Sequence, residues 1–155
     1  MWILTVAIAL HALAAVVWVG GMAFAYWFLR PAAGAALVGP ERQRLWREVF
    51  AGFFPMVWLA IVALLGTGYA MVFGVFGGFP AVGIHVHVMH ATGLLMTLIF
   101  VYVYAFPWRR FRAAVDAADF TTGAARLASI RRMVALNLTL GLLVVIVGAS
   151  GPYWP

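Results

Sequence analysis

The residues Ile84-His85-Val86-His87-Val88-Met89-His90 open a segment that stays apolar as far as Phe106. It holds three of the four histidines, and the fourth, His11, lies near the start of another long apolar segment. A polar side chain within hydrocarbon costs free energy, so an intramembrane histidine is by default a candidate functional residue. Both the fold and the function of this chain therefore depend on its apolar segments.

The composition is that of an integral membrane protein. Of 155 residues, 66% are hydrophobic and 9% are charged, whereas a soluble domain carries about 25% charged residues. The net charge of +6 comes from arginines in two connecting segments, which indicates membrane orientation rather than nucleic-acid binding. There are no cysteines, which excludes disulfides, thiolate metal sites, iron–sulfur clusters and covalent c-type haem attachment.

Four apolar segments predict an all-α integral membrane four-helix bundle, formed by residues 1–155 as one transmembrane domain. The helices are expected at about residues 2–29, 49–73, 84–106 and 133–149, lengths that can cross about 30 Å of hydrocarbon. Arg30-Pro31 should end the first helix, Pro107 the third and Gly151-Pro152 the fourth. Ser129 or Thr122 is the expected N-cap of the fourth helix.

The two basic connections predict the orientation of the bundle. Both of them, residues 32–47 and 109–132, follow odd-numbered helices, and by the positive-inside rule both lie in the cytoplasm. The N-terminus, the turn at residues 74–83 and the C-terminus then face the outer, periplasmic side. We predict a multi-pass protein of the bacterial inner membrane, whose small-residue faces favour a homo-oligomer.

The histidines are candidate ligands. In a helix, His87 and His90 are three residues apart and share a face, whereas His85 points nearly opposite and Met89 joins it. His11 should lie at the depth of His90, because the first and third helices run the same way and each histidine stands equally far from an arginine that follows it. Imidazoles on two helices of a four-helix bundle can hold a common ligand.

Haem b is the first candidate for that ligand. It needs one or two neutral imidazoles in an apolar slot, and His11 with His87 or His90 would give the bis-imidazole ligation of electron-transfer proteins. Copper is the alternative, because imidazole suits copper and thioether suits Cu(I). Met22 and Met89 lie near the histidines in the sequence.

The remaining candidates have structural interpretations as well. Trp18 and Met22 continue the helical stripe that begins at His11, so they either line a cofactor or pack the core. His85 is typical of an interfacial residue. The chain shows no catalytic triad, paired carboxylates or phosphate loop. Whether it is an enzyme stays open. A purely structural or assembly role, in which the histidines only form hydrogen bonds, is a further alternative.

A set of short motifs carries a family resemblance over the whole chain. The motifs are His11-Ala12-Leu13-Ala14-Ala15-Val16-Val17-Trp18-Val19-Gly20-Gly21-Met22, Arg30-Pro31, Phe53-Phe54-Pro55, Val86-His87-Val88-Met89, Arg109-Arg110-Phe111, and Ile130-Arg131-Arg132 followed by Asn137 and Gly141. With them the chain resembles the four-helix membrane proteins of the CopD family (copper resistance protein D-like). It is more distantly similar to the HemJ-type protoporphyrinogen oxidases, which bind haem b.

The resemblance implies roles for particular residues. It gives His11 the ligand position of the first helix and His87, ahead of His90, that of the third. Met89 stands where the oxidases have a lysine, a departure that counts against the oxidase activity. A porphyrin-oxidising enzyme is therefore the alternative to an electron-transfer protein. The expected partners are the lipid bilayer and a quinone, a porphyrin or a redox partner protein.

Overall fold

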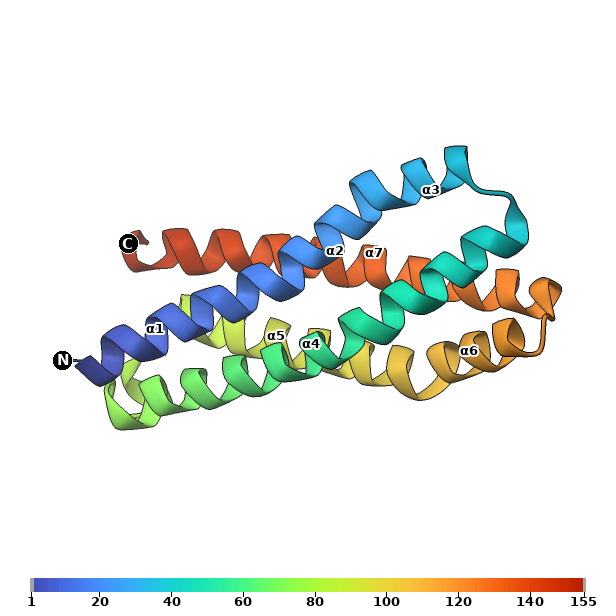
Figure 1. Cartoon of the computed structure of the whole chain (residues 1–155). Coiled ribbons are helices and arrows are strands. Elements are labelled where there is room, and N and C mark those ends of the chain that lie inside the picture. Colours follow the sequence, from blue (N-terminus) through green and yellow to red (C-terminus); the bar gives the residue numbers. More distant parts are fainter. Residues whose placement is uncertain (1, 155) are drawn as a thin grey trace.

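Four long helical rods make up the protein, seen in a computed structural model that describes residues 2–154 (Figure 1). The first rod comprises α1 (Trp2–Ala15), α2 (Gly21–Phe24) and α3 (Arg30–Ala36), joined by the π-helical segments η1 (Val16–Gly20) and η2 (Ala25–Leu29). The second is α4 (Gly39–Gly74). The third comprises α5 (Ile84–Val103), η4 (Tyr104–Trp108) and α6 (Arg109–Asp116), and the fourth α7 (Phe120–Ser150) and η5 (Gly151–Tyr153). All four are long and apolar enough to cross a membrane, which confirms the predicted all-α, four-helix fold.

The rods are longer than the sequence predicted, because neither Pro31 nor Pro107 ends its helix. Pro31 falls in the first turn of α3, where its missing N–H is no loss. Pro107 lies within the π-helical segment η4, whose altered hydrogen-bond pattern accommodates it. The predicted connections are therefore mostly helix, and the breaks at the arginine-rich side shrink to residues 37–38 and 117–119.

The fourth helix begins earlier than predicted, and neither Ser129 nor Thr122 caps it. Asp119 is the N-cap: its carboxylate accepts a hydrogen bond of 3.0 Å from the backbone N–H of Thr122. An aspartate satisfies an orphan helical N–H as well as serine or threonine does. The sequence prediction failed because it took the basic residues that follow as a loop.

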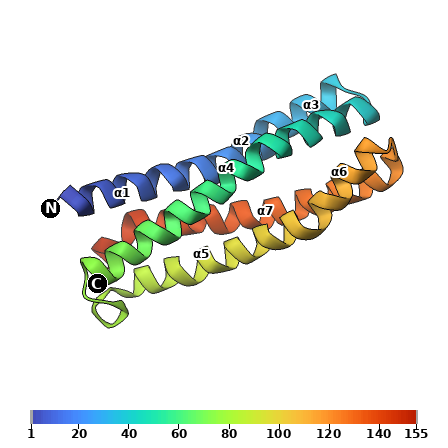
Figure 2. The ribbon, with the colours of Figure 1, turned by 60° about the horizontal axis from the view of Figure 1, so that its bottom comes forward.

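The helices pack as two pairs. α1 lies along α4, and α5 lies along α7 (Figures 1 and 2). The pairs meet chiefly where α4 reaches α7 and α6, and where η1, α2 and η2 reach α7. In the described chain α1 makes no comparable contact with α5 or α7. The bundle is thus joined near its middle and at one end rather than along its whole length.

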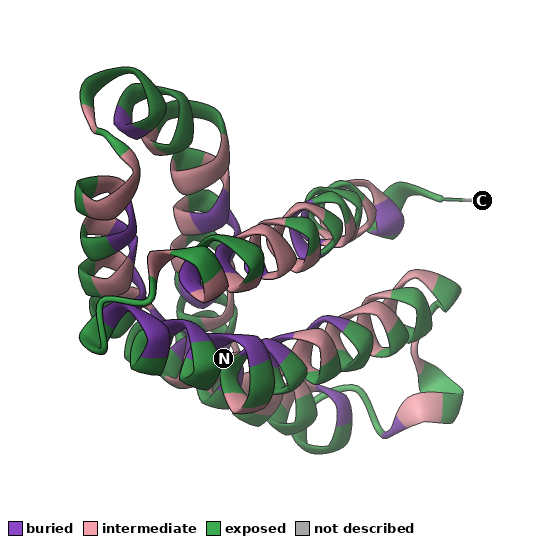
Figure 3. Ribbon diagram, turned by 90° about the vertical axis from the view of Figure 1, so that its right-hand side faces the viewer, coloured by how far each residue is buried: buried purple, intermediate pink, exposed green. Residues whose placement is uncertain are grey.

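The hydrophobic core lies where the two helix pairs meet. Its largest buried side chains are Trp18, Met22, Trp46, Phe50, Phe54, Phe100, Trp108, Phe111 and Ile130. Phe54 stacks on Phe50 at 5.0 Å between ring centroids and meets Trp108 edge-on at 5.3 Å. Towards the termini, buried positions such as Ala7, Ala14 and Gly151 are small, and exposed residues cover most of each ribbon (Figure 3).

Charge is confined to one end of the bundle. Every charged side chain lies within residues 30–48 or 109–132, beside α3 and α6, whereas both termini lie at the opposite end (Figure 1). We call the first the arginine-rich end and the second, where all four histidines lie, the histidine end. The segments between are free of charge, as a hydrocarbon layer requires.

Substitution of Gly141 tests how closely the two helix pairs pack together. A Cβ at this position of α7 would come within 2.9 Å of Val19 and 3.2 Å of Met96. We expect Gly141→Val to overpack the junction, lower the unfolding free energy by about 1–3 kcal/mol and depress the thermal midpoint in detergent. Gly93→Val, in α5, is the matched control because nothing lies within 4 Å of its Cβ position. Equal midpoints for the two variants would contradict this packing.

The Asp119 cap should titrate. Hydrogen bonds from the Thr122 side chain, and then from its backbone N–H, hold the pKa of Asp119 below its ordinary value of 3.8. Because the folded-state pKa is lowered, the cap stabilises α7 above pH 3.8 and is lost as pH falls through the lowered pKa. The amide resonance of Thr122 should shift with a midpoint below 3.8, and in Asp119→Asn, which caps without titrating, it should not. A shift that persists in this variant would contradict the assignment.

Candidate functional site

His11 is held in one orientation by a hydrogen-bonded relay. Its Nδ1 lies 2.9 Å from Oγ1 of Thr67, and the Thr67 hydroxyl donates to the carbonyl of Ala63 at 2.5 Å. Since Thr67 has one hydroxyl hydrogen and gives it to Ala63, its oxygen accepts from Nδ1–H. The hydrogen bond therefore assigns a hydrogen to Nδ1 of His11, and Nε2 has no hydrogen bond among the described residues.

Gly68 makes room for this imidazole. It stands four residues before Val72 and seven after Ile61, both buried, so it belongs to the stripe of α4 that faces the bundle. A Cβ at Gly68 would lie 3.5 Å from Cε1 of His11. The same Cβ position would lie 3.9 Å from Nδ1 and farther from Nε2, so the imidazole lies over a position where α4 has no side chain. A histidine with one nitrogen fixed and the other open has the arrangement found in metal-binding imidazoles.

His87 and His90 share one face of α5, as predicted. Both rings lie against Phe79 of the 3₁₀ turn η3 (Phe79–Ala81), with centroid distances of 5.7 Å and 4.9 Å. His90 also meets Tyr69 edge-on at 5.5 Å. Tyr69 follows Gly68 in α4, so His90 and His11 approach α4 at the same level, in agreement with the depth expected from the sequence.

His85 and Met89 take the opposite face of α5, also as predicted, and both point at α7. His85 is in tight contact with Gly151 and lies 6.3 Å from the ring of Trp154. The Cε of Met89 would be 2.9 Å from a Cβ at Gly148. The thioether thus packs against α7 and lies away from the face that carries His87 and His90.

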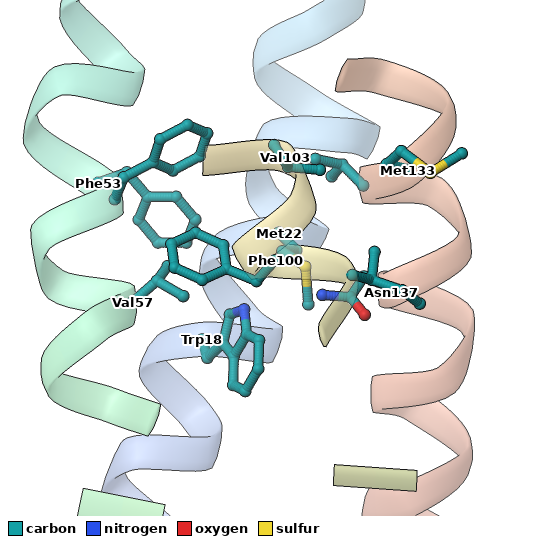
Figure 4. Close-up of a pocket in the computed structure, with 11 residues that line it drawn as sticks. Trp18, Met22, Phe53, Val57, Phe100, Val103, Met133 and Asn137 are labelled. Carbon is teal, nitrogen blue, oxygen red and sulfur yellow. The ribbon is translucent and has the colours of Figure 1, made fainter. Parts of the chain in front are cut away.

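Trp18 and Met22 lie deeper in the bundle than the histidines. Both are 3% exposed and line a cavity of about 20 Å³ together with Asn137 (Figure 4). Trp18 is two helical turns beyond His11, about 10 Å at 1.5 Å per residue. These two residues pack the core, and any part they play at a cofactor would be at its deepest edge.

Asn137 is the buried polar group of this cavity. Its Nδ2 donates to the backbone carbonyl of Met96 at 3.2 Å, which ties α7 to α5, while its Oδ1 is buried without a partner. An unpaired buried acceptor costs free energy, and a cavity of about 20 Å³ has room for one water molecule.

At the histidine end, the imidazole side chains stand singly or in pairs. Within residues 2–154, no three histidine, cysteine or acidic side chains gather as a metal-binding group. Two residues that contact these imidazoles were not predicted from the sequence: Thr67, which bonds to His11, and Phe79, which lies against His87 and His90. The signal for Thr67 was available: it is the sole serine or threonine of α4 and stands between two glycines, Gly66 and Gly68.

Four apolar rods, charge confined to one end and histidines gathered at the other define a multi-pass membrane protein. The family model described as copper resistance protein D matches residues 47–150, and the chain belongs to this family. The family predicted from the sequence motifs is thereby confirmed, while the similarity to HemJ-type oxidases stays a prediction. No curated protein and no solved structure matches the chain.

The His11 relay can be tested without any cofactor. In ¹⁵N-histidine-labelled protein we expect His11 to show the Nδ1–H tautomer, because Thr67 can only accept from it. Thr67→Val should abolish that preference. Thr97→Val is the matched control, since the Thr97 hydroxyl bonds only within its own helix, to Gly93 at 2.9 Å. An Nε2–H signal in the parent protein would refute the relay.

Proposed function

We propose that this protein is a membrane redox protein that holds haem b at its histidine end, with Nε2 of His11 as one axial ligand. The observation that carries the proposal is the hydrogen bond of 2.9 Å between His11 Nδ1 and Thr67 Oγ1. It leaves Nε2 of an imidazole whose ring lies over Gly68 without a hydrogen bond among the described residues. Haem b, when bound, would supply one-electron chemistry at that position.

The surroundings of His11 fit such a group. The second imidazole would come from α5, which carries His87 and His90 on its Phe79 face. α1 and α5 belong to different helix pairs without extensive contact between them, and at the histidine end the pairs meet at His90 and Tyr69. A planar ligand between them would fill a part of the bundle that its own side chains leave lightly packed.

The second axial ligand would be either His87 or His90. The family motif favours His87, which is exposed and one turn nearer the end of the bundle. Depth favours His90, which lies beside Tyr69 at the level of His11. We take His87 as the ligand and His90 as the substitute, and the variants below separate them.

Copper is the second candidate, and the family supports it. Proteins of this family are described by copper resistance, and imidazole is a good copper ligand. A copper site here would rest on the pair His87 and His90, joined by their contact with Phe79. Met89 lies on the other face of α5 and would not contribute from there. A two-imidazole set suits haem as well as it suits copper.

The remaining parts of the proposal rest on the sequence. We place the protein in the bacterial inner membrane with its histidine end on the periplasmic side, because all ten basic residues lie at the other end. Electrons would then pass near the outer surface, to or from a quinone, a porphyrin or a partner protein. A porphyrin-oxidising activity and self-association stay as predictions.

An absorption spectrum combined with metal analysis tests the proposal. For protein purified from haem-sufficient cells we expect a reduced b-type α band with stoichiometric iron. His11→Ala should remove the band, and one of His87→Ala and His90→Ala should do the same. His85→Ala is the matched control, because His85 faces Trp154, which follows η5, and it should keep the band.

Each other outcome has a clear meaning. Stoichiometric copper without haem, lost in His87→Ala or His90→Ala, would replace the haem proposal by the copper one. Protein with neither metal, whose melting is unchanged by all four histidine substitutions, would exclude both. A band that survives His11→Ala would remove His11, and with it the argument from the Thr67 relay.

A further inference from the structure

A second site, of different chemistry, lies at the arginine-rich end. A cavity of about 20 Å³ opens there between the first rod, α4 and α7. Its walls include Arg30 and Arg131 together with Tyr26 and Trp46, and its other lining residues are apolar. Arginine chains at such a position cover apolar surface with their methylene stems and keep the charged group at the rim.

Arg30 of the first rod and Arg131 of α7 line this cavity, and Arg42 of α4 lies within electrostatic reach of Arg131. Arg30 and Arg42 both act electrostatically on Arg131, and the two interactions are repulsive. The guanidinium of Arg30 stacks over the ring of Tyr26 at 5.1 Å from its centroid, which fixes it beside the cavity. Like charges held together in this way favour a bound anion between them.

No acidic side chain of the described chain supplies that anion. The ion pairs present there both belong to Arg47, which binds Glu48 at 2.9 Å and Asp116 at 3.1 Å. Arg30, Arg42 and Arg131 therefore carry positive charge that the protein leaves unneutralised. Guanidinium groups bind phosphate oxygens through paired, directional hydrogen bonds.

We propose that Arg30, Arg42 and Arg131 bind the phosphate of an anionic phospholipid whose acyl chain lies along the apolar wall below them. The position favours a lipid over a free anion. The cavity lies where the apolar segments give way to the arginine-rich end. Between its lining residues Tyr26 and Arg30, the apolar Trp27 and Phe28 are 51% and 64% exposed. A phospholipid matches both the charged rim and the apolar wall, whereas inorganic phosphate matches the rim alone.

Lipid titration of the delipidated protein tests the proposal. In neutral detergent, we expect phosphatidylglycerol to raise the thermal midpoint and to remain bound in native mass spectrometry, and phosphatidylcholine to do neither. The double variant Arg30→Gln/Arg131→Gln should weaken the phosphatidylglycerol affinity at least tenfold. The matched control is Arg109→Gln/Arg110→Gln, which removes the same charge from two exposed residues of α6 and should change the affinity less than threefold.

A further variant and three further results complete the test of the lipid site. If the double variant does not fold, Arg42→Gln alone, at a half-buried position, should still weaken binding. Equal losses in the α6 control would show general charge attraction and overturn the site. Inorganic phosphate that stabilises the protein as well as phosphatidylglycerol would overturn the lipid assignment, and equal binding of phosphatidylcholine would overturn the role of the arginines.

Discussion

The structure depends on one constraint: within hydrocarbon, polar groups must find their partners inside the protein. The backbone meets it by forming four nearly uninterrupted helices. Polar side chains of the membrane-spanning segments bond to backbone or to each other, although Oδ1 of Asn137 has no partner. Thr67 donates to Ala63 and accepts from His11, and Asn137 donates to Met96. Such bonds both satisfy polar groups and fix the orientation of the histidine on which the proposed function rests.

The same constraint divides the bundle into two regions with different properties. Aromatic residues such as Phe54, Phe100 and Trp108 interlock where the helix pairs join, and this gives a rigid core next to the arginine-rich end. The histidine end is held by contacts within each pair and by small buried residues. A ligand can enter a lightly packed region at lower cost than a filled core, because fewer side-chain contacts have to be broken.

The two proposed sites follow from this division. At the histidine end, neutral imidazoles in an apolar setting suit a metal centre, whether haem b or the copper that describes the family. At the arginine-rich end, unneutralised guanidinium groups above an apolar wall suit a lipid phosphate. The sites share no residue and no helix turn, so the loss of one leaves the other to be measured.

The sequence by itself determined the number of helices, the charge asymmetry and the faces of α5, because hydrophobicity and the helical period are local properties. It also contained the motifs of the family. It did not determine the helix ends, since Pro31 and Pro107 were tolerated by helix geometry that only the neighbouring turns reveal. Nor did it determine the partner of His11. Thr67 is 56 residues away, and only the packing of α1 on α4 brings its hydroxyl to Nδ1, so the tertiary structure alone decided which imidazole nitrogen stays open.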